Sequence, residues 1–348
     1  MFRPYTTLFL LGLAACGSNA VSPPATDAGA LDAAKDGPDA SDASAPDAGP
    51  KCGAECDGLA VKDFYAGDAT RDYTVTSTAW KDYGDNLDGL TTTPASSDVC
   101  QRTPGAPSSV QADGTGGIDN SFGSGFVPIV QSLTGNPDIS FTGSTQIGKG
   151  KASTSVFAID GSGKGTATTR FFSGLPLGKS PAWSGADEWP IADESVTGQS
   201  LLSPVVSFPK STLDGTTFDS GPNASGPDGW VLVQVETVAV RIPIHKMRIH
   251  GTLKSGSIDD GIISGIIKTD ELIAETKRIL GTANQAFCSG SVFDGIATQI
   301  KQLQDIRDDG TQDPGKPCNA ISIGLGFSAQ KVRLGAITPT PTLNNPCP

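Results

Sequence analysis

The sequence predicts an α+β fold that is predominantly β, with a sandwich-like antiparallel sheet, two C-terminal helices and disulfide cross-links. Three observations predict this class. Short runs rich in Val, Ile and Thr alternate with Gly, Asn-Pro and Asp-Gly turns along most of the chain. Segments with helical periodicity come late, from residue 270 onward. The six cysteines that follow Cys16 form an even set, which is typical of an exported chain with disulfides.

Alternating or β-branched runs between turns identify the strands. The clearest one covers residues 245–254, where His245, Met247 and Ile249 fall on one face and His250 falls on the other. A regular strand therefore keeps the two histidines on opposite faces, so they share no metal ion unless a bulge intervenes. The other expected strands cover residues 230–242, 258–267 and 321–327.

Two helices are expected between the last two of these strands. Asp270 opens the first, Arg278 is a base in its last turn and Gly281 ends it, as the helix dipole and a C-terminal cap favour. The second helix begins with Ser291 as its N-cap, and Asp294 follows three residues later. A sheet that precedes most of the helical sequence is typical of the α+β class.

The first residues have the order of a bacterial lipoprotein signal. A single base, Arg3, precedes an apolar stretch that is too short to span a bilayer, which takes about 20 residues. Residues 13–16 (LAAC) then resemble a lipobox, so we expect residues 1–15 to be a cleavable signal peptide and Cys16 to carry the lipid. Gly17 is not the aspartate that commonly retains lipoproteins in the inner membrane, so an outer-membrane anchor is expected, with the domain facing the periplasm or the exterior. An ordinary secretory signal with an incidental cysteine is the alternative.

Composition divides the rest of the chain into three parts. Residues 16–51 are the lipidated cysteine and an Ala/Asp/Pro-rich spacer, which has too little apolar surface to order itself. A single globular β-rich domain over residues 52–337 and a Pro-rich tail over residues 338–348 follow. The formal charge of −12 argues against nucleic acid and against adhesion to anionic headgroups. Membrane contact through the lipid anchor alone is therefore expected.

The six remaining cysteines are the disulfide candidates. They are Cys52, Cys56, Cys100, Cys288, Cys318 and Cys347. Spacing does not choose among their pairings, but Cys288 with Cys318 is preferred because that bond would join the two ends of the helical unit. A zinc site is the alternative, although only Cys52 and Cys56 are closely spaced and no histidine lies near them.

An aromatic and acidic stretch is the preferred place for a ligand. Trp183, Asp187, Glu188 and Trp189 put two large rings beside two carboxylates. Such rings stack on sugar faces, and the carboxylates bind hydroxyls. The alternative is that both rings fill the open end of the sheet.

Calcium is the ionic cofactor considered, and no other cofactor is expected. Asp305, Asp309 and Asp313 fall at ligand positions when Gly310 takes the turn position of an EF-hand loop. Lys316 occupies the position where that loop needs a bidentate glutamate. A capped helix end followed by a polar turn explains the same stretch without a metal.

Catalytic motifs are scarce, so no catalytic residue is assigned and a non-enzyme is favoured. The chain has no G-x-S-x-G motif, and residues 143–150 and 174–180 match a phosphate loop only in part. The leading hypothesis is a membrane-tethered, non-catalytic binding or structural module whose partner is unknown. One alternative is a carrier of an apolar, lipid-like ligand. The other is a hydrolase that uses the clustered acids Asp187, Glu188, Asp193 and Glu194.

Several segments together resemble a group of uncharacterised envelope lipoproteins of Gram-negative bacteria. These segments are the lipobox with its Asp/Ala-rich linker, residues 117–123 (GIDNSFG) with the VPIV that follows, and residues 309–327. The resemblance covers most of the folded region. It implies an envelope location and the extent of the domain, but no activity, cofactor or catalytic residue.

Overall fold

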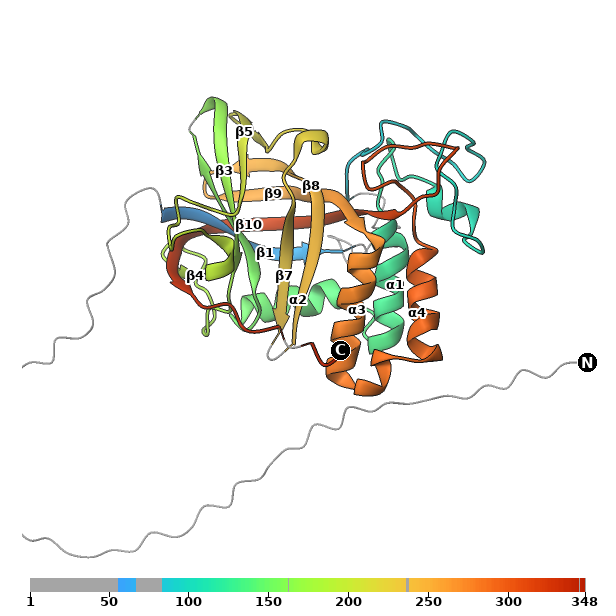
Figure 1. Ribbon diagram of the computed structural model, residues 1–348. Coiled ribbons are helices and arrows are strands. Elements are labelled where there is room, and N and C mark those ends of the chain that lie inside the picture. Colours follow the sequence, from blue (N-terminus) through green and yellow to red (C-terminus); the bar gives the residue numbers. More distant parts are fainter. Residues whose placement is uncertain (1–55, 67–82, 162, 236–237, 344, 348) are drawn as a thin grey trace, which may run out of the picture. The chain divides into compact units, whose positions relative to one another are not determined.

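The computed structural model of the chain describes residues 56–66, 83–161, 163–235, 238–343 and 345–347 (Figure 1). The signal peptide, Cys16, the spacer and Cys52 lie outside the described residues, so their expected roles stay predictions. The described part forms a strand-dominated α+β domain that is cross-linked by disulfides, as the sequence predicts.

Ten strands of the described part belong to one sheet. The strands are β1 (Asp57–Tyr65), β2 (Thr154–Asp160), β3 (Lys164–Gly174), β4 (Glu188–Ala192), β5 (Val206–Asp214), β6 (Thr217–Asp219), β7 (Gly229–Val235), β8 (Val238–Lys254), β9 (Ser257–Lys268) and β10 (Ala320–Thr338). The expected strand over residues 230–242 is in fact divided between β7 and the start of β8, which pair as an antiparallel hairpin.

The pairings of eight of these strands close into a ring. The order around it is β1, β2, β3, β5, β6, β8, β9 and β10, and β10 pairs with β1 again. All of these pairs are antiparallel. Outside the ring, β7 pairs with β8, and β4 pairs with β10 in the parallel sense, which makes the sheet mixed.

The ring encloses the main hydrophobic core. Aromatic side chains from five of its strands meet there and are almost fully buried: Phe157, Phe171, Phe208, Phe218 and Phe327. Phe157 and Phe327 pack edge to face, with 5.6 Å between their ring centroids. Burial of each ring contributes roughly 1.5–3 kcal/mol to stability. The interior is therefore filled by side chains of the chain itself.

Four α-helices are present in the described part: α1 (Val127–Thr134), α2 (Ile139–Gly148), α3 (Thr269–Ala283) and α4 (Ser291–Lys301). The last two are the predicted pair; α3 contacts both β8 and α4, and Figure 1 shows α1 drawn between α3 and α4. The other two were not predicted. None of the helices in the described ranges is long and apolar enough to cross a membrane.

The ends of the predicted helices differ in detail from the expectation. Gly281 lies inside α3 instead of ending it. A side chain does not fit at this position, because a Cβ would stand 2.4 Å from the Sγ of Cys347. Its role is close approach of the C-terminal segment. Ser291 is the first helical residue of α4, and the N-cap is Gly290, with a φ of 96°.

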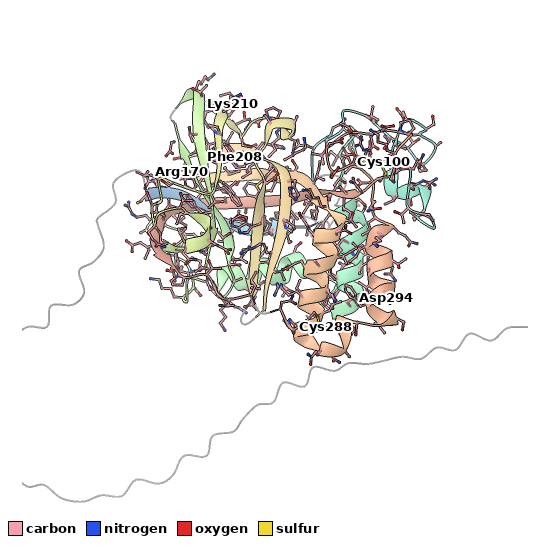
Figure 2. The ribbon with its side chains drawn as sticks, viewed as in Figure 1. Cys100, Arg170, Phe208, Lys210, Cys288 and Asp294 are labelled. Atoms are coloured by element: carbon pink, nitrogen blue, oxygen red, sulfur yellow. A yellow bond between two sulfur atoms is a disulfide. The ribbon has the colours of Figure 1, made fainter. Side chains whose placement is uncertain are left out.

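Two disulfides are described, Cys100–Cys318 and Cys288–Cys347. The preferred pair of Cys288 with Cys318 is therefore wrong. Cys318 lies beside Cys100 because the residues next to them in the chain are paired. The backbone of Gln101 donates to the carbonyl oxygen of Lys316 and accepts the N–H of Cys318. Figure 2 shows Cys100 among the loops beyond one end of the helices and Cys288 at the other end. Cys56 is buried and is also disulfide-bonded.

Candidate functional site

A groove of about 470 Å³ lies between β8, α3 and the C-terminal segment, within the size range of small-molecule sites. We call it the β8–α3 groove. Its lining residues are Arg241, Pro243 and His245 from β8, Glu271, Ala274, Glu275 and Arg278 from α3, and Leu343 and Asn345 from the C-terminal segment.

Two periodicities build this groove. Residues 241, 243 and 245 alternate along β8, so their side chains share one face of the strand. Residues 271, 274, 275 and 278 are spaced by three, four and seven, so they form one stripe of α3. The other side of α3 buries Leu272 in the main core, which turns the polar stripe toward β8.

A bulge places His245 in the groove. Ile244, Met247 and Ile249 are all fully buried, so the inward positions are spaced by three and then by two. The extra residue is Lys246, whose φ of 53° is left-handed, and the register with β9 shifts at the same place. His245 and His250 therefore lie on the same outward face of β8, and the expectation of opposite faces is wrong.

The two histidines nevertheless have different partners. The Nε2 of His245 lies 2.7 Å from a carboxylate oxygen of Glu271, and its Nδ1 lies 3.0 Å from one of Asp228. His250 contacts Asp85 at 3.2 Å instead. In the described ranges, no group of three or more His, Cys, Asp or Glu side chains could hold a metal ion. The imidazole of His245 is held between two carboxylates at one end of the groove.

Arg241 dominates the opposite end. Its guanidinium lies over the ring of Trp230, 5.1 Å from the ring centroid, and its Nη2 donates to Glu194. The backbone N–H of Arg241 donates to Glu275 at 2.7 Å. The buried Nε has no hydrogen-bond partner among the described residues. Arg241 therefore holds an oriented guanidinium with unused donor capacity at this end of the groove.

Arg278 adds a second guanidinium to this end of the groove. It pairs with Glu275 at 2.6 Å and donates to the carbonyl oxygen of Ala239, which links α3 to the start of β8. The hydrogen bond and the charge of Glu275 outweigh burial and raise the pKa of Arg278 above its usual value. Two guanidiniums therefore face two carboxylates here.

The C-terminal segment forms the remaining wall. Leu343 and Asn345 reach the groove, and the Cys288–Cys347 disulfide ties the segment to the turn after α3. The Sγ of Cys347 also lies 3.5 Å from the carbonyl oxygen of Lys277. The Pro-rich tail is thus fixed against α3 by a covalent bond.

The aromatic and acidic stretch expected to bind a ligand, residues 183–189, makes contacts mostly within the domain itself. Trp183 and Trp189 stack with 5.5 Å between ring centroids, but Trp189 is 0 % exposed, so its faces are not available to a sugar. Asp187 is buried and accepts the backbone N–H groups of Ala182 and Trp183 at 3.1 and 2.7 Å. Glu188 is exposed at the start of β4. The contacts resemble the alternative in which the rings fill one end of the sheet.

The candidate calcium ligands do not converge. Asp305 is buried and accepts hydrogen bonds from the backbone and hydroxyl of Ser322. Asp309 pairs with Arg307 and Asp313 with Lys316, at 3.0 and 3.2 Å. Each carboxylate thus has its own partners.

The four candidate hydrolase acids are also separated by their contacts. Asp187 holds the Trp183 loop, Asp193 accepts the backbone and hydroxyl of Thr340, and Glu194 pairs with Arg241. Hydrogen bonds from Thr340 lower the pKa of Asp193.

Four carboxyl groups from three stretches of the chain influence one another electrostatically. We define the buried carboxyl cluster as the buried Asp119 and Asp305 with the half-buried Asp88 and Asp113. Asp119 accepts the backbone N–H of Leu87 at 2.7 Å. Burial, with the charges of Asp88 and Asp305, raises the pKa of Asp119 to about 9. Burial also raises the pKa of Asp113, and that of Asp305 to about 7.

Comparison with known proteins provides no relative for this chain. No family model matches it, and neither the curated proteins nor the solved structures contain a match. The function must therefore be argued from the groove itself.

Proposed function

We propose that the protein is an outer-membrane lipoprotein whose domain is a non-catalytic binding module, and that the β8–α3 groove is its binding site. The observation that carries this proposal is the groove, which combines an apolar floor with a guanidinium end and an acidic end. Pro243 and Ala274 supply the floor, and Arg241 and His245 mark the ends. Few convergent polar groups around an apolar floor are typical of ligand sites.

The filled ring interior favours a surface groove over an internal carrier site. Large side chains such as Phe218, Met247 and Phe327 are 0 % exposed inside the ring. An acyl chain would have to displace such residues, and each costs about 1.5–3 kcal/mol when it loses its burial. The hydrolase alternative is less favoured because Asp187, Asp193 and Glu194 are held by unrelated partners.

The tether is supported by the N-terminal motif and fits the disulfides. Disulfides persist in oxidising compartments, which suits an exported chain. The test is incorporation of labelled palmitate into the full-length protein in a Gram-negative host. We expect label in the wild type and none in Cys16→Ser. Labelled Cys16→Ser protein would overturn the lipid assignment.

Binding is tested on the full mature protein with a thermal-shift panel of sugars, amino acids, short peptides, polyamines and fatty acids. Ala274→Trp fills the groove from an exposed position on α3, so it should abolish any shift that the wild type shows. Gln299→Trp, on an exposed position of α4, is the matched control and should keep it. Turnover of a panel compound, or a shift that survives Ala274→Trp, would overturn the proposal.

A further inference from the structure

We infer that the β8–α3 groove binds a short zwitterionic peptide of two or three small residues, with its carboxylate at Arg241 and its ammonium group on the exposed sides of the Asp228 and Glu271 carboxylates. This inference rests on the proposed function and names its ligand class. Three features carry it: the guanidinium end, the acidic end and the distance between them.

The Arg241 end is built to accept a carboxylate. The side chain of Arg241 is 36 % exposed, and its guanidinium is oriented by Trp230 and Glu194. A guanidinium has more donors than the one that Glu194 accepts, and its charge strengthens a hydrogen bond to a carboxylate. Arg241 and Arg278 are balanced by Glu194 and Glu275, so the end is neutral before a ligand arrives. An incoming carboxylate therefore meets donors without facing a net negative charge.

The opposite end is acidic. Asp228 and Glu271 flank His245, whose side chain is 14 % exposed, while those of the two acids are 70 % and 39 % exposed. Each carboxylate meets one nitrogen of the imidazole, and its exposed side remains open to a ligand. A peptide ammonium group is a compact donor that suits such a site. The contrast between the two ends orients the ligand, because the reversed peptide would put its carboxylate beside two acids.

The spacing sets the length of the ligand. Arg241 and His245 are four residues apart in β8, which corresponds to about 13 Å at about 3.3 Å per residue. An extended dipeptide spans about 7 Å and a tripeptide about 10 Å, and a hydrogen bond of about 2.8 Å at each end adds about 5.6 Å, so peptides of two or three residues bracket this separation. Pro243, Ala274 and Leu343 lie between the ends, so small apolar side chains such as alanine fit the floor. A single amino acid is too short to reach both ends.

The test is isothermal titration of the full mature protein with tri-alanine, N-acetyl-tri-alanine and tri-alanine amide. The wild type should bind tri-alanine, and each blocked peptide should bind at least tenfold more weakly. This arm needs no variant, so it does not depend on the folding of a mutant. Equal binding of all three peptides, or no binding of tri-alanine at millimolar concentration, would overturn the inference.

Two variants assign the ends. In Arg241→Gln, tri-alanine should bind about as weakly as its amide, because the carboxylate has lost its partner. In Glu271→Gln, the acetylated and free peptides should bind alike. Arg333→Gln and Asp294→Asn remove an arginine and an acid outside the groove and should keep the wild-type pattern. Loss of both discriminations in either groove variant would contradict the assignment of the ends.

The outcome separates the inference from the proposed function. If tri-alanine fails but another panel compound gives a shift that Ala274→Trp abolishes, the peptide inference is wrong and the binding module stands. If no panel compound binds, both are wrong.

Discussion

The buried carboxyl cluster should make the protein less stable as the pH rises. The pKa of Asp119 is raised from 3.8 to about 9, and that of Asp305 from 3.8 to about 7, with burial as the main cause. Between about pH 5 and pH 6 both groups are therefore protonated in the folded protein and ionised in the unfolded chain, and toward pH 7 Asp305 begins to ionise in the folded protein as well. For each pH unit of increase in this range, every proton that only the folded state retains lowers the free energy of unfolding by about 1.4 kcal/mol. The two protons together lower it by about 2.7 kcal/mol per pH unit. Their contribution is complete below pH 3.8, and for Asp119 it is lost as the pH rises through about 9.

Asp119→Asn tests this reasoning. The amide oxygen can still accept the backbone N–H of Leu87, which donates at 2.7 Å in the wild type, but the side chain no longer titrates. The fall in stability between about pH 5 and pH 7 should become shallower by about 1.4 kcal/mol per pH unit. The assay is urea unfolding followed by tryptophan fluorescence across this range, with the exposed Asp98→Asn as the control that keeps the wild-type slope. An unchanged slope in Asp119→Asn would refute the role of this carboxyl.

Three further substitutions test the packing around the ring and the groove. Gly324→Ala should destabilise by roughly 1–3 kcal/mol in urea unfolding, because the added Cβ would stand 2.2 Å from the carbonyl oxygen of Tyr83; unchanged stability would contradict this close approach. Cys347→Ser opens the 59-residue loop to Cys288 and should cost about 4 kcal/mol by loop entropy, measured against the wild type under oxidising conditions. Lys246→Val should cost about 1–2 kcal/mol because a β-branched residue tolerates the left-handed φ of 53° poorly, whereas Lys246→Gly should be neutral or stabilising; the reverse order of stabilities would argue against the bulge.

Local patterns predicted the elements whose signals were strong and complete. Apolar runs beside Gly-rich turns identified β9 and the core of β10, and end signals identified α3 and α4. α1 also carries readable signals, since a proline lies in its first turn and Gly135 ends it with a left-handed φ of 65°. Its eight residues are too few for a helical period to stand out from the surrounding sequence. α2 includes glycines and polar residues, and no local pattern distinguishes it from a loop.

Features that depend on distant segments could not be predicted in the same way. Cys318 pairs with Cys100 across a sequence separation of 218, because the loop around Gln101 runs beside the start of β10. Nothing near either cysteine in the sequence encodes that neighbour. Trp189 was assigned to a ligand site for its residue type, but its burial is decided by packing against β3, where Gly174 makes room for the indole. The stripe of Glu271, Glu275 and Arg278 was present in the sequence, yet only the position of β8 makes it one wall of a groove.

The bulge at Lys246 explains why the groove was missed and why it exists. A strict period of two allows either Ile244 or Met247 on the inward face, but both are fully buried. Burial of a second large apolar side chain gains about 1.5–3 kcal/mol, which offsets the roughly 1–2 kcal/mol that a left-handed lysine costs. The same extra residue reverses the alternation on its N-terminal side, so His245 faces Glu271 instead of the core. Packing of the two apolar side chains therefore maintains the bulge. As a consequence, the side chain of His245 lies in the groove between β8 and α3.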